Sequence, residues 1–215
     1  RPELTLRDGR IVVPGSLFRW WYGLPSDYER SGTLVINSNS LWLVARDKLA
    51  TTAAVAQAVS FRTPRTFAIE SAEEVEWLLE EHRELFRSGY VLKPRWGWGG
   101  YGIQIADAGT APRRISGEYL LCERIRPWPR PAAVHPFWDA RLFVMDGVCV
   151  GGLIHSAASP NTNYWQGGRV EPLPAPLLER LAPAAEEAVR WIDAAAEERH
   201  RLPPDHDSPL LRVEY

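Results

Sequence analysis

Short apolar runs alternate with amphipathic segments along this chain of 215 residues. Runs of four to seven mainly apolar or alternating residues, bounded by Gly, Pro, Asn or Asp, predict short strands. An Asp-Gly pair divides two apolar runs near the start of the chain and again at residues 146–147, and this pattern predicts two β-hairpins. The predicted strands and hairpins are residues 4–13, 34–37, 66–69, 90–94, 103–106, 119–125, 139–154 and 210–215.

Three segments have the composition or spacing of helices. Residues 47–58 are rich in alanine, and Ser71 with Glu74 forms a capping box before an apolar stripe that runs from Val75 to Phe86. A further stripe follows Pro176. Residues 14–33 and 156–175 lack either period and are expected to be loops, and helices and strands mixed in this way predict an α+β fold.

Composition and charge exclude several classes of protein. Hydrophobic residues make up 45% of the chain and charged residues 24%, which is typical of a globular domain rather than a disordered one. No apolar run approaches the about 20 residues that a membrane-spanning helix needs. The net charge of −2 lacks the basic excess that binds phosphate backbones. We therefore expect neither a membrane nor a nucleic acid as partner.

Two cysteines, Cys122 and Cys149, are far apart and in no CxxC motif. This usage favours free thiols and a cytoplasmic protein, with a single disulfide as the alternative. The chain begins at Arg1 without Met or a signal segment and stops at Tyr215 within a predicted strand, so we expect both ends to be cut.

A glycine-rich segment, Gly97-Trp-Gly99-Gly-Tyr-Gly102, matches the GxGxxG pattern. In a dinucleotide-binding fold this pattern opens a helix, but here alternating residues such as Ile103 follow, and no Lys-Ser/Thr pair completes a Walker A motif. A glycine-rich hairpin remains, and its backbone N–H groups could lie close to phosphate oxygens. Most of the ten tryptophans are expected in the core, although Trp96 and Trp98 could also stack on a planar ligand.

Two lysines lie beside this hairpin in the predicted fold. Lys93 ends the strand that enters it, and Lys48 opens the predicted helix at 47–58. Either could be a solvated surface lysine, but an ammonium next to a glycine-rich loop is well placed for phosphate. Together with the loop, the two lysines indicate a nucleotide site.

The order of these segments, from about Thr33 to Tyr215, resembles the ATP-grasp ligases of the glutathione synthetase and ribosomal-protein glutamate ligase type. The matching segments are Asn37 with Asp47-Lys48, Pro64-Arg-Thr66, Val91-Leu92-Lys93-Pro94 with residues 97–102, Leu120-Leu121-Cys122-Glu123-Arg124-Ile125, Asp139-Ala-Arg141, residues 161–168 and Arg212-Val213-Glu214-Tyr215. The resemblance implies an ATP-grasp fold in which two α/β subdomains clamp a nucleotide. It implies the end of an N-terminal pre-ATP-grasp domain at 1–45, the glycine-loop subdomain at 46–118, and an incomplete C-terminal subdomain at 119–215.

The resemblance also implies roles for individual residues. The nucleotide-binding set is Lys48, Lys93, Gly97, Gly99, Gly100, Gly102, Cys122 and Glu123; the catalytic set is Arg141, Asn163 and His155; and the metal ligand is Glu214. The chain departs from the family where Cys122 replaces a common glutamine, where His155 replaces a common arginine, and where it stops before Glu-x-Asn. A satisfied strand histidine is the alternative for His155.

The activity that the resemblance implies is ATP-dependent ligation of a carboxylate to an amine through an acyl phosphate, with ADP as product and with ATP and Mg²⁺ required. The expected substrates are small-molecule or peptide acids and amines, such as an amino acid or a natural-product precursor, and a homodimer is compatible with them. Two alternatives remain: an ATP-binding module of the same fold that serves regulation or assembly without ligase chemistry, and a ligase that modifies peptides by ester or amide formation.

Overall fold

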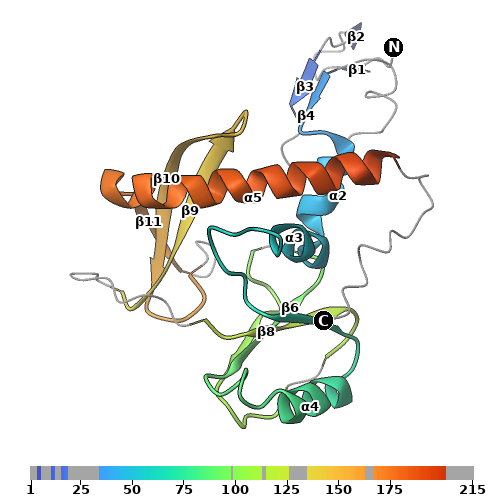
Figure 1. Cartoon of the computed structure of the whole chain (residues 1–215), viewed down its shortest axis with the longest axis vertical. Coiled ribbons are helices and arrows are strands. Elements are labelled where there is room, and N and C mark those ends of the chain that lie inside the picture. Colours follow the sequence, from blue (N-terminus) through green and yellow to red (C-terminus); the bar gives the residue numbers. More distant parts are fainter. Residues whose placement is uncertain are drawn as a thin grey trace.

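A computed structural model of the chain describes residues 4–5, 11–12, 16–18, 34–97, 99–112, 115–125, 135–162 and 167–201 (Figure 1). The structural statements that follow concern these residues. The elements are β1 (Leu4–Thr5), β2 (Ile11–Val12), β3 (Ser16–Phe18), β4 (Leu34–Ile36), α2 (Asn39–Arg46), α3 (Lys48–Val55), β5 (Thr66–Ile69), α4 (Ala72–Glu81), β6 (Tyr90–Pro94), β7 (Gln104–Ala106), β8 (Tyr119–Glu123), β9 (Phe137–Met145), β10 (Val148–Ala157), β11 (Arg169–Pro172) and α5 (Ala175–Arg201).

A four-stranded antiparallel sheet, in the order β5-β8-β6-β7, is packed between two helices. On one face Leu49 of α3 packs against Leu120 and Cys122, and on the other face α4 contributes Val75 and Leu78 to the larger core cluster. Successive side chains of a strand point to opposite faces. Since Lys93 is paired with Leu120, Lys93 lies on the face that α3 covers.

A three-stranded antiparallel sheet, in the order β11-β10-β9, forms the second half of the described structure. The turn between β9 and β10 is the predicted Asp-Gly pair, with Asp146 at φ 50° and Gly147 at φ 74°. Helix α5 packs on β9 and β10 and also on α2 and α3, so it runs from one sheet to the helices of the other (Figure 1). Along β9 Arg141 is exposed, which leaves it on the side that α5 does not bury.

Most of the predicted elements are confirmed. The hairpin around Asp8-Gly9 is formed by β1 and β2, and the strands predicted between residues 34 and 154 are all present. At α4 the Ser71 hydroxyl oxygen accepts from the Glu74 N–H at 3.1 Å, while the Glu74 carboxylate accepts from the Glu70 N–H at 2.7 Å. The mixed architecture confirms the α+β class.

Several predictions about loops were wrong. Strand β3 lies inside the predicted loop at 14–33 and pairs in parallel with β4, which follows that loop. The end of β10 and all of β11 lie inside the predicted loop at 156–175. All four residues of β11 are exposed, so the strand has no alternation of apolar and polar residues that would reveal it. Helix α2 was not predicted. Ser38 is its N-cap, and the Ser38 hydroxyl oxygen accepts from the Leu41 N–H at 3.1 Å.

The division at residues 45/46 and 118/119 stays a prediction, and β8, placed in the third unit, shares its sheet with β5, β6 and β7 of the second. The predicted strand at 210–215 lies outside the described residues. Both cysteines are free, and no helix in the described part of the chain has the length and hydropathy to cross a membrane.

Candidate active site

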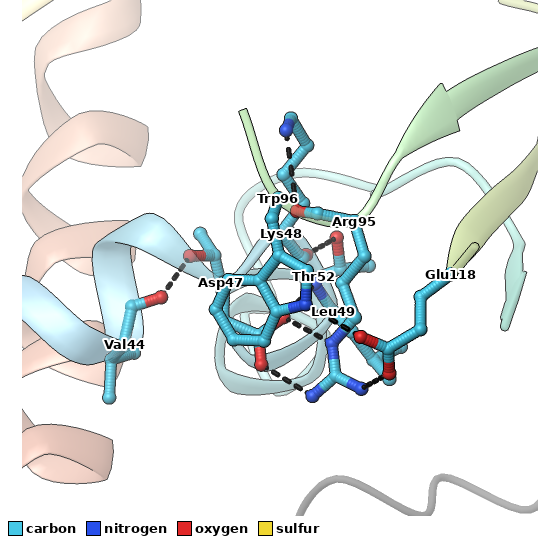
Figure 2. A network of polar contacts seen from close by, with 9 residues as sticks. Val44, Asp47, Lys48, Leu49, Thr52, Arg95, Trp96 and Glu118 are labelled. Carbon is cyan, nitrogen blue, oxygen red and sulfur yellow. Dashed lines mark hydrogen bonds and ion pairs between the residues drawn. The ribbon is translucent and has the colours of Figure 1, made fainter. Parts of the chain in front are cut away.

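Lys48 binds the segment that leads from β6 into the glycine-rich loop (Figure 2). Its ammonium donates to the carbonyl oxygens of Pro94 at 2.9 Å, Arg95 at 3.3 Å and Gly97 at 2.7 Å. Asp47 fixes the start of the helix, because its carboxylate accepts from the Leu49 N–H at 3.0 Å. Lys48 is therefore held at the base of the glycine-rich loop.

The positive charge of Lys93 acts on Lys48 on the face of the sheet that α3 covers. The pKa of Lys48 is lowered, first by its burial and second by the positive charge of Lys93, while Asp47 acts in the opposite direction. Two ammonium groups held near each other repel, and an anion between them removes that repulsion. The pair is thus a site of concentrated positive charge beside the glycine-rich loop.

The composition of the chain carries a signal for this pair that the sequence interpretation missed. Lys48 and Lys93 are the only lysines in the chain, although lysine and arginine together number 25. Every other basic residue of that sum is an arginine. A compact ammonium is used at these two positions alone, and a planar guanidinium everywhere else.

The glycines of the loop are required by its backbone. Gly97, Gly99, Gly100 and Gly102 all have positive φ, between 71° and 124°. At Gly100 a Cβ atom would lie 2.8 Å from the side-chain nitrogen of Asn161, and that nitrogen donates to the Gly100 carbonyl at 3.4 Å. The loop consequently touches the segment that follows β10 in the second sheet.

Asp139 continues this line of contacts into the second sheet. Its carboxylate accepts from the Thr162 hydroxyl and, at 3.2 Å, from Nε of Arg141. Thr162 directly follows Asn161, which touches the glycine-rich loop. Contacts among the described residues thus join Lys48 to Gly97, Gly100 to Asn161, Thr162 to Asp139, and Asp139 to Arg141.

His155 lies beside this cluster. It is paired with Asp139 across β9 and β10, so both side chains stand on the same face of the sheet. His155 is only 8% exposed, and its Nδ1 has no hydrogen-bond partner among the described residues. Its pKa is lowered, first by burial and then by the charge of Arg141, with Asp139 opposing. The structure therefore does not show the satisfied strand histidine that was the alternative.

Two other predicted residues, Cys122 and Glu123, lie at the end of β8. The side chain of Cys122 is 2% exposed, packs with Leu49 and is 3.5 Å from the Thr66 hydroxyl, so it belongs to the core under α3. The Glu123 carboxylate accepts from the Arg65 N–H at 3.4 Å, and its own N–H donates to the Arg65 carbonyl at 2.9 Å. Neither side chain joins the contacts between Lys48 and Arg141.

The remaining predicted residues, Asn163 and Glu214, lie outside the described residues, as does Trp98. Within the described ranges no group of three His, Cys, Asp or Glu side chains could hold a metal ion. The catalytic role of Asn163 and the metal role of Glu214 stay predictions. The sequence interpretation gave no role to Asp139, Asn161 and Thr162, which join the two sheets.

No protein-family model and no curated protein matches the sequence. The fold, in contrast, is similar to that of solved structures. D-cycloserine synthetase DcsG is similar with a TM-score of 0.54 and 17% identity, over 80% of this chain and 59% of that one. The ATP-grasp ligase PsnB complexed with minimal precursor is similar with a TM-score of 0.48 and 16% identity, over 79% and 50%. The chain spans about three fifths of the length of the former and half of the latter.

At this level of identity the similarity to DcsG is a similarity of fold. The chain has the ATP-grasp fold, as the order of its sequence motifs predicts. The activity of the protein is a separate question, because one fold supports many functions and the site has to decide between them.

Proposed function

We propose that this protein is an ADP-forming ATP-grasp ligase that joins a carboxylate to an amine. One observation supports the proposal: contacts among the described residues link Lys48 to the start of the glycine-rich loop, the same loop to Asn161, and Thr162 to Asp139 beside Arg141 on the second sheet. Cations from two sheets that meet at one site would supply the positioning and the charge neutralisation that transfer of a phosphoryl group requires.

On the side of the four-stranded sheet, Lys48 and Lys93 would bind the phosphates of ATP. Each ammonium supplies a point charge, and backbone N–H groups of a loop with positive φ at its glycines add donors that no Cβ obstructs. These groups neutralise negative charge on the leaving ADP. No protein nucleophile is needed in such a reaction, because positioning and charge stabilisation carry most of the catalysis.

On the side of the three-stranded sheet, Arg141 would stabilise the phosphoryl group as it passes to the carboxylate. A carboxylate oxygen attacks the γ-phosphorus, and the bond to ADP breaks. The amine then attacks the carbonyl carbon of the acyl phosphate, the C–N bond forms, the C–O bond to phosphate breaks, and inorganic phosphate and a proton leave. Asp139 orients the Arg141 guanidinium through the bond at 3.2 Å. The neutral imidazole of His155 is available to hydrogen-bond a substrate, since its lowered pKa keeps it uncharged near neutral pH.

Mg²⁺ would be held by carboxylates together with ATP oxygens, and Glu214 is the residue proposed for it. The proposed substrates are a small-molecule or peptide acid and an amine. By name DcsG is a D-cycloserine synthetase, whereas PsnB was solved in complex with a minimal precursor. These two names do not indicate a common substrate.

The test is incubation with ATP, Mg²⁺ and pools of carboxylic acids and amines, with ADP release measured. The proposal predicts release that needs both an acid and an amine, and Arg141→Ala serves as the inactive control. ATP binding without ADP release from any pool would favour the regulatory module, and release that needs a hydroxyl compound in place of the amine would favour ester formation.

A further inference from the structure

A partly buried ionic cluster lies beside Lys48 and has no part in the chemistry proposed above (Figure 2). Arg95 donates from Nε and Nη2 to the two carboxylate oxygens of Asp47, at 2.9 and 2.6 Å, and from Nη1 to Glu118 at 2.8 Å. The side chains of Arg95 and Asp47 are 13% and 1% exposed. Trp96 completes the cluster by donating from its indole nitrogen to Glu118 at 2.7 Å.

The backbone of Arg95 is held as firmly as its side chain. Its N–H donates to the Glu118 carbonyl at 3.0 Å, and its carbonyl accepts from the Lys48 N–H at 3.3 Å. Arg95 thereby joins the end of β6, the start of α3 and the residue before β8. Pairs this deeply buried are costly to desolvate and are poor evidence of stability alone, so their geometry is the more informative property.

We propose that Arg95 is a positioning residue that holds Lys48 and Lys93 together as one phosphate-binding pair. Lys48 follows Asp47, the bidentate partner of Arg95, and Lys93 lies two residues before Arg95 on β6. The inference rests on the proposed ATP site, and it concerns how that site is built in the absence of nucleotide.

Electrostatics explains why such a residue is needed. Before ATP binds, Lys48 and Lys93 repel each other, and the fold has to oppose that repulsion. The Asp47–Arg95 pair fixes the start of α3 against the end of β6, and the carbonyls of Pro94, Arg95 and Gly97 accept the Lys48 ammonium. A lysine at position 95 keeps the charge but cannot form the planar fork, so Arg95→Lys separates geometry from charge.

The composition of the chain makes a direct test possible. Lys48 and Lys93 carry the only side-chain amines of the parent chain, and Arg95→Lys adds one that is distant from Lys48 in sequence. Acetic anhydride labelling followed by mass spectrometry of the peptide that contains Lys48 therefore reports its pH midpoint in both proteins. The charged groups around Lys48 are Asp47 on its own helix, Lys93 and Arg95 on the β6 side, and Glu118 through Arg95. In Arg95→Lys we expect the Lys48 midpoint to move to higher pH, because Lys48 leaves the neighbourhood of Lys93.

The same variant should bind Mg²⁺-ATP about tenfold more weakly, measured by calorimetry, because the two ammonium groups no longer converge. Val75→Ala is the matched control, since Val75 is fully buried on α4, which packs on the face of the sheet opposite to α3. That control should lose stability without a change in either the Lys48 midpoint or the ATP affinity.

An unchanged midpoint and affinity in Arg95→Lys would overturn the inference, as would equal shifts in Val75→Ala. If Arg95→Lys does not fold, Glu118→Gln replaces one of the two carboxylates that accept from Arg95. We then expect about threefold weaker ATP binding and a shift of the Lys48 midpoint in the same direction. No change there would also overturn it. If the wild-type protein binds no Mg²⁺-ATP, the proposed function fails, while the midpoint shift still tests the role of Arg95.

Discussion

The polar residues around the two sheets differ in exposure and in the number of their hydrogen-bond partners. Around the four-stranded sheet Lys48 has three carbonyl partners, and Arg95 has two carboxylates. Around the three-stranded sheet the Arg141 side chain is 46% exposed with one carboxylate beside it, and Nδ1 of His155 has no partner among the described residues. At the four-stranded sheet these cations have protein partners, whereas at the three-stranded sheet Arg141 is exposed to solvent and Nδ1 of His155 has no described partner.

This difference indicates how the work is divided. A phosphate site gains from cations already fixed in place, because no reorganisation is then needed when ATP binds. Polar groups without partners carry a cost that a ligand can repay by hydrogen bonding to them. We therefore propose that the four-stranded sheet binds the nucleotide and that the open face with Arg141 and His155 binds the reacting acid and amine.

The comparison predicts its largest effect at Arg141. Arg141→Ala should lower the rate of ADP release by at least about 100-fold, because charge on the transferring phosphoryl group loses its stabilising donor. ATP affinity should stay nearly unchanged, since the ground-state phosphates are held from the other sheet. Steady-state assays and calorimetry on the same sample check both parts. Equal losses in affinity and in rate would mean that the division between the sheets is wrong.

Lys93→Met should have the converse effect. Loss of a charge-assisted contact should weaken ATP binding by about 1.5 to 3 kcal/mol, which calorimetric titration measures directly. The methionine keeps much of the length of the side chain, so packing on the α3 face is largely preserved. Binding as tight as that of the parent protein would make Lys93 an ordinary surface lysine.

His155 allows a smaller test of the open half through pH. Its pKa lies below 6.5 in the folded protein, so the unfolded chain binds its proton more readily. The free energy of unfolding should be highest above pH 6.5 and fall as the pH drops below it, by at most about 1.4 kcal/mol per unit. His155→Asn should remove this dependence in denaturant titrations. If the free energy of unfolding depended on pH in the same way in the parent and in His155→Asn, the site would not be holding the imidazole neutral.

The smallest effect is expected where α5 contacts the loop after α3. The pKa of Glu187 is lowered from 4.5 to about 2, mainly because its carboxylate accepts from the Ser60 hydroxyl and then from the Val59 N–H. A depressed carboxyl pKa stabilises the fold above pH 4.5, and that contribution is lost as the pH falls toward 2. The difference in Tm between the parent and Glu187→Gln should shrink in this window. Because Glu187 is exposed, the difference should be small, and a constant one would contradict the assignment.

Local patterns predicted much of the fold. The Asp-Gly turns, the Ser71 cap and the glycines with positive φ follow from rules that act within a few residues. Contacts distant in sequence were harder to predict. Arg95 finds Asp47 across 48 positions and Glu118 across 23, and nothing in the residues near Arg95 indicates either partner.

The candidate site divides in the same way. Motif order predicted that Lys48, Lys93 and Arg141 serve one site, but Asp139, Asn161 and Thr162 join the sheets through contacts that only the folded chain reveals. The side chain of Cys122 lies in the core under α3, and its place in the nucleotide-binding set stays a prediction. One signal was present in the sequence and missed, namely that both lysines of the chain lie at the site.

The central claim is that one nucleotide bridges the two sheets. A crystal structure of the protein with Mg²⁺ and a non-hydrolysable ATP analogue tests it most directly. The account predicts a triphosphate in contact with Lys48 and Lys93 on one side and with the Arg141 guanidinium, directly or through one water, on the other. A nucleotide bound elsewhere, or one bound to the lysines while Arg141 points to solvent on another face, would contradict it.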